Sequence, residues 1–296
     1  MDNVRGSILM VLAMLGFAIE DMFIKLLSAH LPAGEVMMIL GVGGVLLYWI
    51  ALRRQNVPLF STVFFERGVV LRNIAEFVGT GAFVTAFTLG EISTTSAIMQ
   101  ALPLVVTMGG ALFLGQQVGW RRWTAIFVGF IGVIIVINPQ PSGVDPLALL
   151  ALVAVLGLGS RDVITRPLRG QIHSLQLAAY GFVTIIPLGA TMMVLQGETP
   201  VVPTGIDYLY LLLCISIGVV AYYLLILASR IGELAVVAPF RYTRILFALT
   251  VGAVVFAETL ELHMLVGCAI IVMSGIYTFY RESRARRASL SSSVRV

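Results

Sequence analysis

Residues that support chemistry in soluble enzymes are scarce in this chain, which holds two cysteines and three histidines among 296 residues. Cys214 and Cys268 fall within apolar stretches, and neither they nor His30, His173 and His263 show the spacing of a metal site. No Gly-Lys-Ser/Thr sequence, which a Walker loop requires, is present. The sequence therefore predicts no metal, cofactor or nucleotide site, and no nucleophile–base constellation indicates an enzyme.

Charged residues are also few, at 11% of the chain, whereas hydrophobic residues make up 59% and the mean hydropathy is +0.99. A soluble core does not bury that much apolar surface. A bilayer core about 30 Å thick accepts roughly 20 apolar residues per helix, and backbone groups in lipid must bond one another. The apolar stretches are continuous and do not alternate, so they predict helices rather than barrel strands. We expect an all-α membrane protein with ten transmembrane helices, near residues 6–27, 34–52, 70–89, 95–115, 122–138, 145–163, 174–196, 206–229, 235–256 and 262–280.

The second half of the chain repeats the first. Residues 15–28 resemble residues 156–169, and residues 89–100 resemble residues 231–242 at nearly the same offset. The superposed residues include Asp21 with Asp162, Lys25 with Arg166, Gly90-Glu91 with Gly232-Glu233, and Gly110-Ala111 with Gly252-Ala253. Each half holds five predicted helices, an odd number, so the second copy enters the membrane in the opposite direction. We expect two inverted repeats, 1–140 and 141–280, and a basic tail, 281–296, which is a common construction of secondary transporters.

Most of the 19 Lys and Arg residues fall in connections on one side of the predicted membrane span. This bias predicts that both termini are cytoplasmic in a multi-pass protein of a bacterial inner membrane. Anionic lipid, rather than nucleic acid, is the expected partner of the basic tail. The first helix carries charged residues and lacks a small-residue cleavage pattern, so we expect it to be retained.

Charged residues inside the predicted helices require an explanation, because burying a charge in lipid is costly. Arg244 falls near the middle of the ninth helix, and Arg241 precedes it by one turn. Glu20 lies in the first helix, and its counterpart in the second repeat is Arg161. We predict that Arg244 binds a substrate carboxylate, or Glu20 in the empty site, and that Glu20 binds a substrate ammonium or a proton. Snorkelling and helix–helix contact are the alternatives, above all for Arg241 and Arg161.

Two acid–base pairs occur at the spacing of one helical turn. Asp21 precedes Lys25, and Asp162 precedes Arg166, at equivalent places in the two repeats. Such pairs stabilise a helix by a few tenths of a kcal/mol in water, roughly 0.2–0.5 kcal/mol. We expect both pairs to form within their own helices, with a structural or gating role.

The fourth predicted helix contains Pro103, which removes one backbone hydrogen bond and frees a carbonyl near Met99. Gln100, beside this break, offers a polar group to a substrate; a kink packed by its neighbours is the alternative. Roughly one side chain in three or four on a helix can face a cavity. Aromatic candidates for an apolar cavity wall are Phe17, Phe77, Tyr180, Tyr222, Tyr223 and Tyr242, of which Phe17, Phe77, Tyr180 and Tyr223 are predicted with Met99 and Gln100 to bind substrate.

The chain resembles the ten-helix drug/metabolite transporter superfamily, EamA type. The likeness is carried by Gly16 and Lys25 and by residues 72–116, 232–258 and 265–276. The resemblance implies a secondary transporter, and the bacterial amino-acid exporters of that superfamily, including aromatic amino-acid exporters, are similar in length and layout. The chain departs from the family pattern at Gly115-Gln116, where Gly-Glu is usual, although Glu258 keeps the acid in the second repeat.

Taken together, these features predict an exporter of amino acids with aromatic and other apolar side chains. It would have broad specificity and work by alternating access around a midplane cavity. A carrier of another solute, such as a vitamin, a nucleotide-like cofactor or a cationic drug, is the alternative. An intramembrane enzyme or a non-transporting membrane protein is the rival from another class. Proton coupling and a homodimer are left open.

Overall fold

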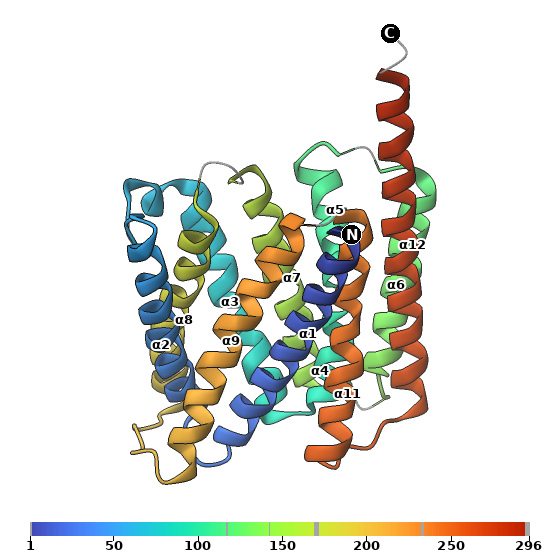
Figure 1. Cartoon of the computed structure of the whole chain (residues 1–296). Helices are drawn as coiled ribbons and strands as arrows, with labels where there is room; N and C mark the ends of the chain where they lie inside the picture. Colours follow the sequence, from blue (N-terminus) through green and yellow to red (C-terminus); the bar gives the residue numbers. More distant parts are fainter. Residues whose placement is uncertain (1, 117, 142, 169–171, 232–233, 294–296) are drawn as a thin grey trace.

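The computed structural model describes residues 2–116, 118–141, 143–168, 172–231 and 234–293. Regular structure in these ranges is helical, and ten of the spans are long and apolar enough to cross a membrane. The protein is therefore an all-α membrane protein, as the sequence predicts. α1 begins and α12 ends at the same end of the bundle, toward the top of Figure 1, which we call the terminal end. Gly232 and Glu233, which carry one of the repeat matches, lie outside the described residues.

Each repeat contributes five spans. The first holds α1 (Asp2–Leu27), α2 (Ala33–Arg54), the short η1 (Thr62–Phe65), α3 (Arg67–Leu89), α4 (Ile92–Met99), α5 (Leu102–Phe113) and α6 (Trp120–Ile137). The second holds α7 (Pro146–Leu168), α8 (Ser174–Gln196), α9 (Ile206–Ile231), α10 (Leu234–Val237), η2 (Ala238–Tyr242), α11 (Thr243–Val255) and α12 (Leu262–Ser293). α12 continues past residue 280 to Ser293 and projects beyond the bundle (Figure 1).

One span in each repeat is broken rather than continuous. In the first repeat, the helix stops at Met99 and resumes at Leu102, with Pro103 in the first turn of α5. In the second, the 3₁₀ segment η2, which contains Pro239, separates α10 from α11. Proline lacks the N–H that a continuous helix needs, so both breaks lie at a proline. The break after Met99 agrees with the one expected from Pro103, and η2 interrupts the predicted span 235–256 as well.

Four helix pairs, each with one member from each repeat, make the largest contacts between the repeats: α1 with α9, α2 with α8, α3 with α7, and α6 with α12. Small residues allow the closest approaches. A β-carbon added to Gly157 of α7 would lie 2.7 Å from the Cα atom of Gly79 on α3. These contacts join the repeats side by side.

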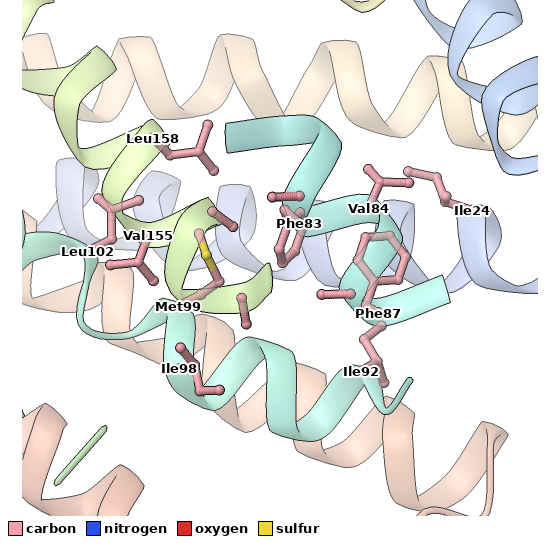
Figure 2. Packing of buried hydrophobic residues seen from close by; sticks show 14 of the residues in the cluster. Ile24, Phe83, Val84, Phe87, Ile92, Ile98, Met99, Leu102, Val155 and Leu158 are labelled. Carbon is pink, nitrogen blue, oxygen red and sulfur yellow. The ribbon is translucent and has the colours of Figure 1, made fainter. Parts of the chain in front are cut away.

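Buried apolar side chains fill the centre of the bundle. Phe83 and Val84 of α3, Met99 of α4 and Leu158 of α7 converge there (Figure 2). The same four side chains form part of the wall of an internal cavity. The hydrophobic core and the cavity therefore share residues, and the elements that hold the core also shape the cavity.

The repeat is visible in backbone geometry where α5 and α11 end. Each helix closes with an N–H bonded back to a glycine carbonyl: Gln116 to Gly110 at 3.1 Å, and Glu258 to Gly252 at 2.9 Å. The residue before each donor has a positive φ, +63° at Gly115 and +52° at Ala257. A left-handed residue ends a helix by this kind of bond. Gln116 and Glu258 are therefore structural equivalents, as the sequence offset predicts.

Candidate substrate site

A cavity of ≈ 210 Å³ lies between the two repeats. Its wall combines side chains from α1, α2, α3, α4, α5, α7, α8, α9, η2 and α11. Most of the wall is apolar. The polar side chains that line it are Glu20, Asp21, Glu76, Thr80, Gln100, Arg161, Arg241 and Arg244. Both broken spans reach the cavity, because Met99 and Gln100 lie at one break, and Arg241 of η2 and Arg244 of α11 lie at the other.

The structure brings most of the predicted site residues to this cavity. The predicted substrate-binding residues found in its wall are Phe17, Glu20, Met99, Gln100 and Arg244. The predicted gating or structural residues found there are Asp21, Pro103, Arg161 and Arg241. The cavity therefore gathers side chains that lie far apart in the sequence.

Four predicted wall residues lie elsewhere, and one of them, Tyr242, is buried and lines a different pocket beside α11 and α12. Phe77 packs against the core, and Tyr180 is buried beside Val69 and Leu168. Tyr223 on α9 is 46% exposed, whereas its neighbour Tyr222 lines the cavity. Successive residues on a helix are about 100° apart, so two adjacent tyrosines cannot both face inward. Phe83 and Phe182 complete the aromatic wall, and nothing in their sequence context distinguished them from packing residues.

Arg244 is held by Asp21. Its guanidinium donates to the Asp21 carboxylate at 2.5 Å and lies over the rings of Phe17 and Phe83, 5.5 and 5.3 Å from their centroids. A contact between Arg244 and Glu20 in the empty site is therefore wrong. Pairing of Asp21 with Lys25 is wrong too, since a partner from the other repeat takes its place. The spacing of one helical turn gave no sign of this long-range partner.

Glu20 has no such partner among the described residues: its carboxylate forms no salt bridge and accepts no hydrogen bond there. The carboxylate lies against Gly218 of α9, where a β-carbon would collide with it. Phe17 lies one turn before Glu20 on α1, and Tyr222 lies one turn after Gly218 on α9. Their rings meet edge to face, with centroids 6.4 Å apart. A carboxylate beside aromatic rings is suited to a cationic group.

An ionic network joins α3, α7 and η2 on another part of the wall. Arg161 donates to Glu76 at 2.9 Å and to Asp162 at 2.8 Å. Arg72 pairs with Glu76 at 2.7 Å, and Arg241 approaches Asp162 at 3.9 Å. Every carboxylate in this network has an arginine beside it, so the network reads as a structural tie between the repeats.

The predicted pair of Asp162 with Arg166 does not form. Asp162 is engaged by Arg161, and Arg166 donates to Gln116 of the first repeat at 2.9 Å. In the first repeat, Lys25 pairs with Glu258 of the second at 2.7 Å. Lys25 and Arg166 therefore both reach across to the other repeat. Their partners are separated from them by far more than one helical turn.

Comparison with known sequences agrees with this architecture. Residues 4–138 and again residues 146–280 match the EamA-like transporter family. The chain belongs to the EamA-like transporter family. The two matches each cover one five-span repeat, so the family assignment and the repeated fold support one another. A solved crystal structure is similar in fold, with a TM-score of 0.57 and 15% identity over 89% of this chain and 94% of that chain.

Similar EamA-like proteins include a riboflavin transporter of Rhizobium johnstonii, 27% identical over 73% of this chain and 71% of the relative. An S-adenosylmethionine uptake transporter of Rickettsia prowazekii is 22% identical over 95% and 94%. The pseudopaline exporter CntI of Pseudomonas aeruginosa is 24% identical over 92% and 94%. These relatives are transporters, and the chain is accordingly a multi-pass membrane transporter of this family.

Proposed function

We propose that this protein exports amino acids with aromatic and other apolar side chains across a bacterial inner membrane. The observation that carries the proposal is the pairing of opposite charges on an aromatic wall. Glu20 is free to accept a substrate ammonium, and Arg244 offers a planar fork to a carboxylate. The rings of Phe17, Phe83 and Tyr222 between them suit an apolar side chain.

The size of the cavity supports a small solute. Its volume is ≈ 210 Å³, whereas pockets for drug-sized ligands span about 300–1,000 Å³. An amino acid suits this volume, while a flavin or a nucleoside requires the two repeats to move further apart. The wall provides few directional contacts to a side chain, so we expect broad specificity and weak affinity.

Binding requires Arg244 to exchange partners. In the empty cavity the Asp21 carboxylate occupies the position that a substrate carboxylate needs. We propose that the substrate displaces Asp21 while its ammonium binds Glu20, and that the repeats, 1–140 and 141–280, then rock about the filled cavity. Because the exchange replaces one carboxylate by another, Arg244 is never left buried without a counter-charge.

The proposed orientation of the chain in the membrane rests on the distribution of its charges. The helix ends at the terminal end carry five arginines, Arg53 and Arg54 of α2, Arg67 of α3, and Arg121 and Arg122 of α6. Positive residues collect on the cytoplasmic side, which supports cytoplasmic termini. Charge alone does not set the direction of transport, so export is the part of the proposal that the likeness to exporters carries.

Transport of a larger solute is the second candidate function. The relatives favour it, since they are named for riboflavin, S-adenosylmethionine and pseudopaline. S-adenosylmethionine itself has an α-amino-acid head, so Glu20 and Arg244 suit it as well. The two candidates differ in the space that the rest of the molecule needs. Direct competition distinguishes them.

The test is uptake of labelled phenylalanine, threonine and methionine into proteoliposomes holding the purified chain, first without an ion gradient and then with a pH gradient. Unlabelled riboflavin and S-adenosylmethionine are added as competitors in parallel. Saturable uptake that the three amino acids inhibit mutually supports the amino-acid carrier. Absence of uptake in both conditions, or inhibition by the larger solutes alone, transfers the assignment to the second candidate.

A further inference from the structure

Among the contacts between the repeats, one at each end of the bundle lies at an equivalent position. At the terminal end, Arg166 of α7 meets Gln116, which follows α5. At the opposite end, Lys25 of α1 meets Glu258, which follows α11. Sequence offset relates Lys25 to Arg166, and backbone geometry relates Gln116 to Glu258. We call these contacts the terminal latch and the opposite latch.

The opposite latch is a largely buried ion pair whose two partners form further hydrogen bonds. The side chains of Lys25 and Glu258 are 14% and 6% exposed, and Nζ and Oε1 are 2.7 Å apart. Lys25 also donates to the carbonyl of Gly90 at 2.7 Å. The Glu258 carboxylate accepts the N–H groups of Ile92 and Ser93 at 2.8 and 2.9 Å, where α4 begins. Separating the repeats here strips the Glu258 carboxylate of three donors and the Lys25 ammonium of one acceptor, because Gly90 belongs to the same repeat as Lys25.

The terminal latch has the same scaffold and a weaker contact. Arg166 donates to the Gln116 amide oxygen at 2.9 Å, and Gln116 is exposed. The glycines beneath the two latches are equivalent as well, because a β-carbon on Gly110 would meet Gln116 and one on Gly252 would meet Glu258. The latches thus differ in side-chain charge and in burial, and share their backbone geometry.

We infer that the empty carrier opens preferentially at its terminal end, because Gln116 closes that end with a neutral acceptor while Glu258 closes the opposite end with a buried ion pair. Breaking a buried pair leaves uncompensated charge, whereas breaking an exposed hydrogen bond returns both groups to water. The inference concerns the balance between two closed ends and does not depend on which solute is carried.

The preference for opening at the terminal end sets the apparent affinity of the carrier for its ligand on each side of the membrane. A ligand that binds only the state open to its side has an apparent affinity reduced by the fraction of carriers in that state. Where the termini are cytoplasmic, which is part of the proposed function, the cytoplasmic side loads more readily. The final concentration ratio of a passive carrier is unaffected, since the latches supply no energy.

The test measures access to the cavity from each side. In a chain with Cys214→Ala and Cys268→Ala, Thr80→Cys places a thiol in the cavity wall. Its reaction rate with a membrane-impermeant maleimide is measured in vesicles of both orientations, and a C-terminal tag identifies the side that carries the termini. The variant Gln116→Glu turns the terminal latch into an ion pair. The matched control is Gln55→Glu, an exposed glutamine in the connection after α2, at the same end of the bundle.

We expect the parent chain to react faster from the terminal side. Gln116→Glu should lower that rate about two- to fivefold, the range that an exposed ion pair of ~0.4–1 kcal/mol allows, and raise the rate from the opposite side. Gln55→Glu should leave both rates unchanged. Equal rates from the two sides of the parent, faster reaction from the opposite side, or a Gln116→Glu profile identical to the control would overturn the inference. Transport is not measured, so failure of the amino-acid assignment leaves this test intact.

Discussion

Arg244 on α11 binds the carboxylate of Asp21 on α1, while the neighbouring Glu20 faces the cavity without a described partner. Two adjacent acidic residues on one helix therefore differ in whether their carboxylates are paired. One is engaged by an arginine of the other repeat, and the other is available to a ligand. The contact also joins the first repeat to the broken span of the second, so a ligand that displaces Asp21 changes the connection between the repeats.

Asp21→Asn should increase the affinity for zwitterionic substrates, because it removes the carboxylate that competes for Arg244. Hydrogen bonds to charged groups contribute about 1.5–3 kcal/mol, and part of this is offset by the unpaired Arg244, so we expect the KM to fall severalfold. The measurement is the KM for phenylalanine in proteoliposomes. Phenethylamine, which lacks the carboxylate, should compete equally well with both proteins. An unchanged or higher KM for phenylalanine would remove Asp21 from the binding cycle.

Glu20→Gln should weaken binding of solutes that carry an ammonium. Losing a charge-assisted contact of about 1.5–3 kcal/mol corresponds to a roughly tenfold to hundredfold rise in KM. The matched control is Glu91→Gln, which alters an exposed carboxylate beside α4. If both variants transport phenylalanine with the KM of the parent, Glu20 does not hold the ammonium.

The sequence predicted the spans far better than the partners of their charged residues. The boundaries of α8, Ser174–Gln196, match the expected 174–196, because α8 is one apolar stretch between polar connections. Lys25 was assigned to Asp21, four residues away, yet its partner Glu258 lies in the other repeat. Helical spacing identifies neighbours along one helix only. A charged residue in a buried site pairs with whichever opposite charge the packing of the helices places beside it, and that residue can lie far away in the sequence.

The residues of the cavity wall could also be predicted from the sequence only in part. Phe17 and Arg244 could be placed there by charge and position in the repeat, but the choice of Tyr223 over Tyr222 depended on the rotation of α9 about its axis. That rotation follows from the contact of Gly16 with Ala221, a pair of small residues on α1 and α9. No single sequence shows which small residues of two apolar helices meet.

The opposite latch should resist mild acid. Burial raises the pKa of Glu258, but the hydrogen bonds from Lys25, Ser93 and Ile92 outweigh it and lower the pKa below the usual 4.5. A carboxyl with a lowered folded-state pKa stabilises the fold fully above its ordinary pKa and loses this contribution as the pH falls through the lowered value. The difference in thermal stability between the parent and Glu258→Gln should therefore stay constant from about pH 7.5 to pH 5.5 and shrink below pH 4.5. A difference that shrinks already between pH 7 and pH 6 would contradict this.

Gly79→Val should loosen the contact of α3 with α7, because the added side chain meets the backbone of Gly157 and Leu158. Overpacking of a close contact costs about 1–3 kcal/mol. Thermal unfolding of the detergent-solubilised chain measures the loss. Gly119→Ala is the control, since a β-carbon there meets nothing within 4 Å. Equal melting temperatures for the two variants would show that the helices separate without cost.

The two latches differ in their acceptor residue, Gln116 or Glu258, and a single mutation can exchange one kind of acceptor for the other. Codons for glutamine and glutamate differ at a single nucleotide, so a point mutation at position 116 or 258 exchanges the two kinds of contact. The preferred open side of the carrier is thus a heritable setting that selection can reverse without altering the fold or the cavity. Selection for restored activity in a Glu258→Gln strain should yield second-site changes at Gln116 or Arg166, far from the original lesion in sequence and at the other end of the bundle.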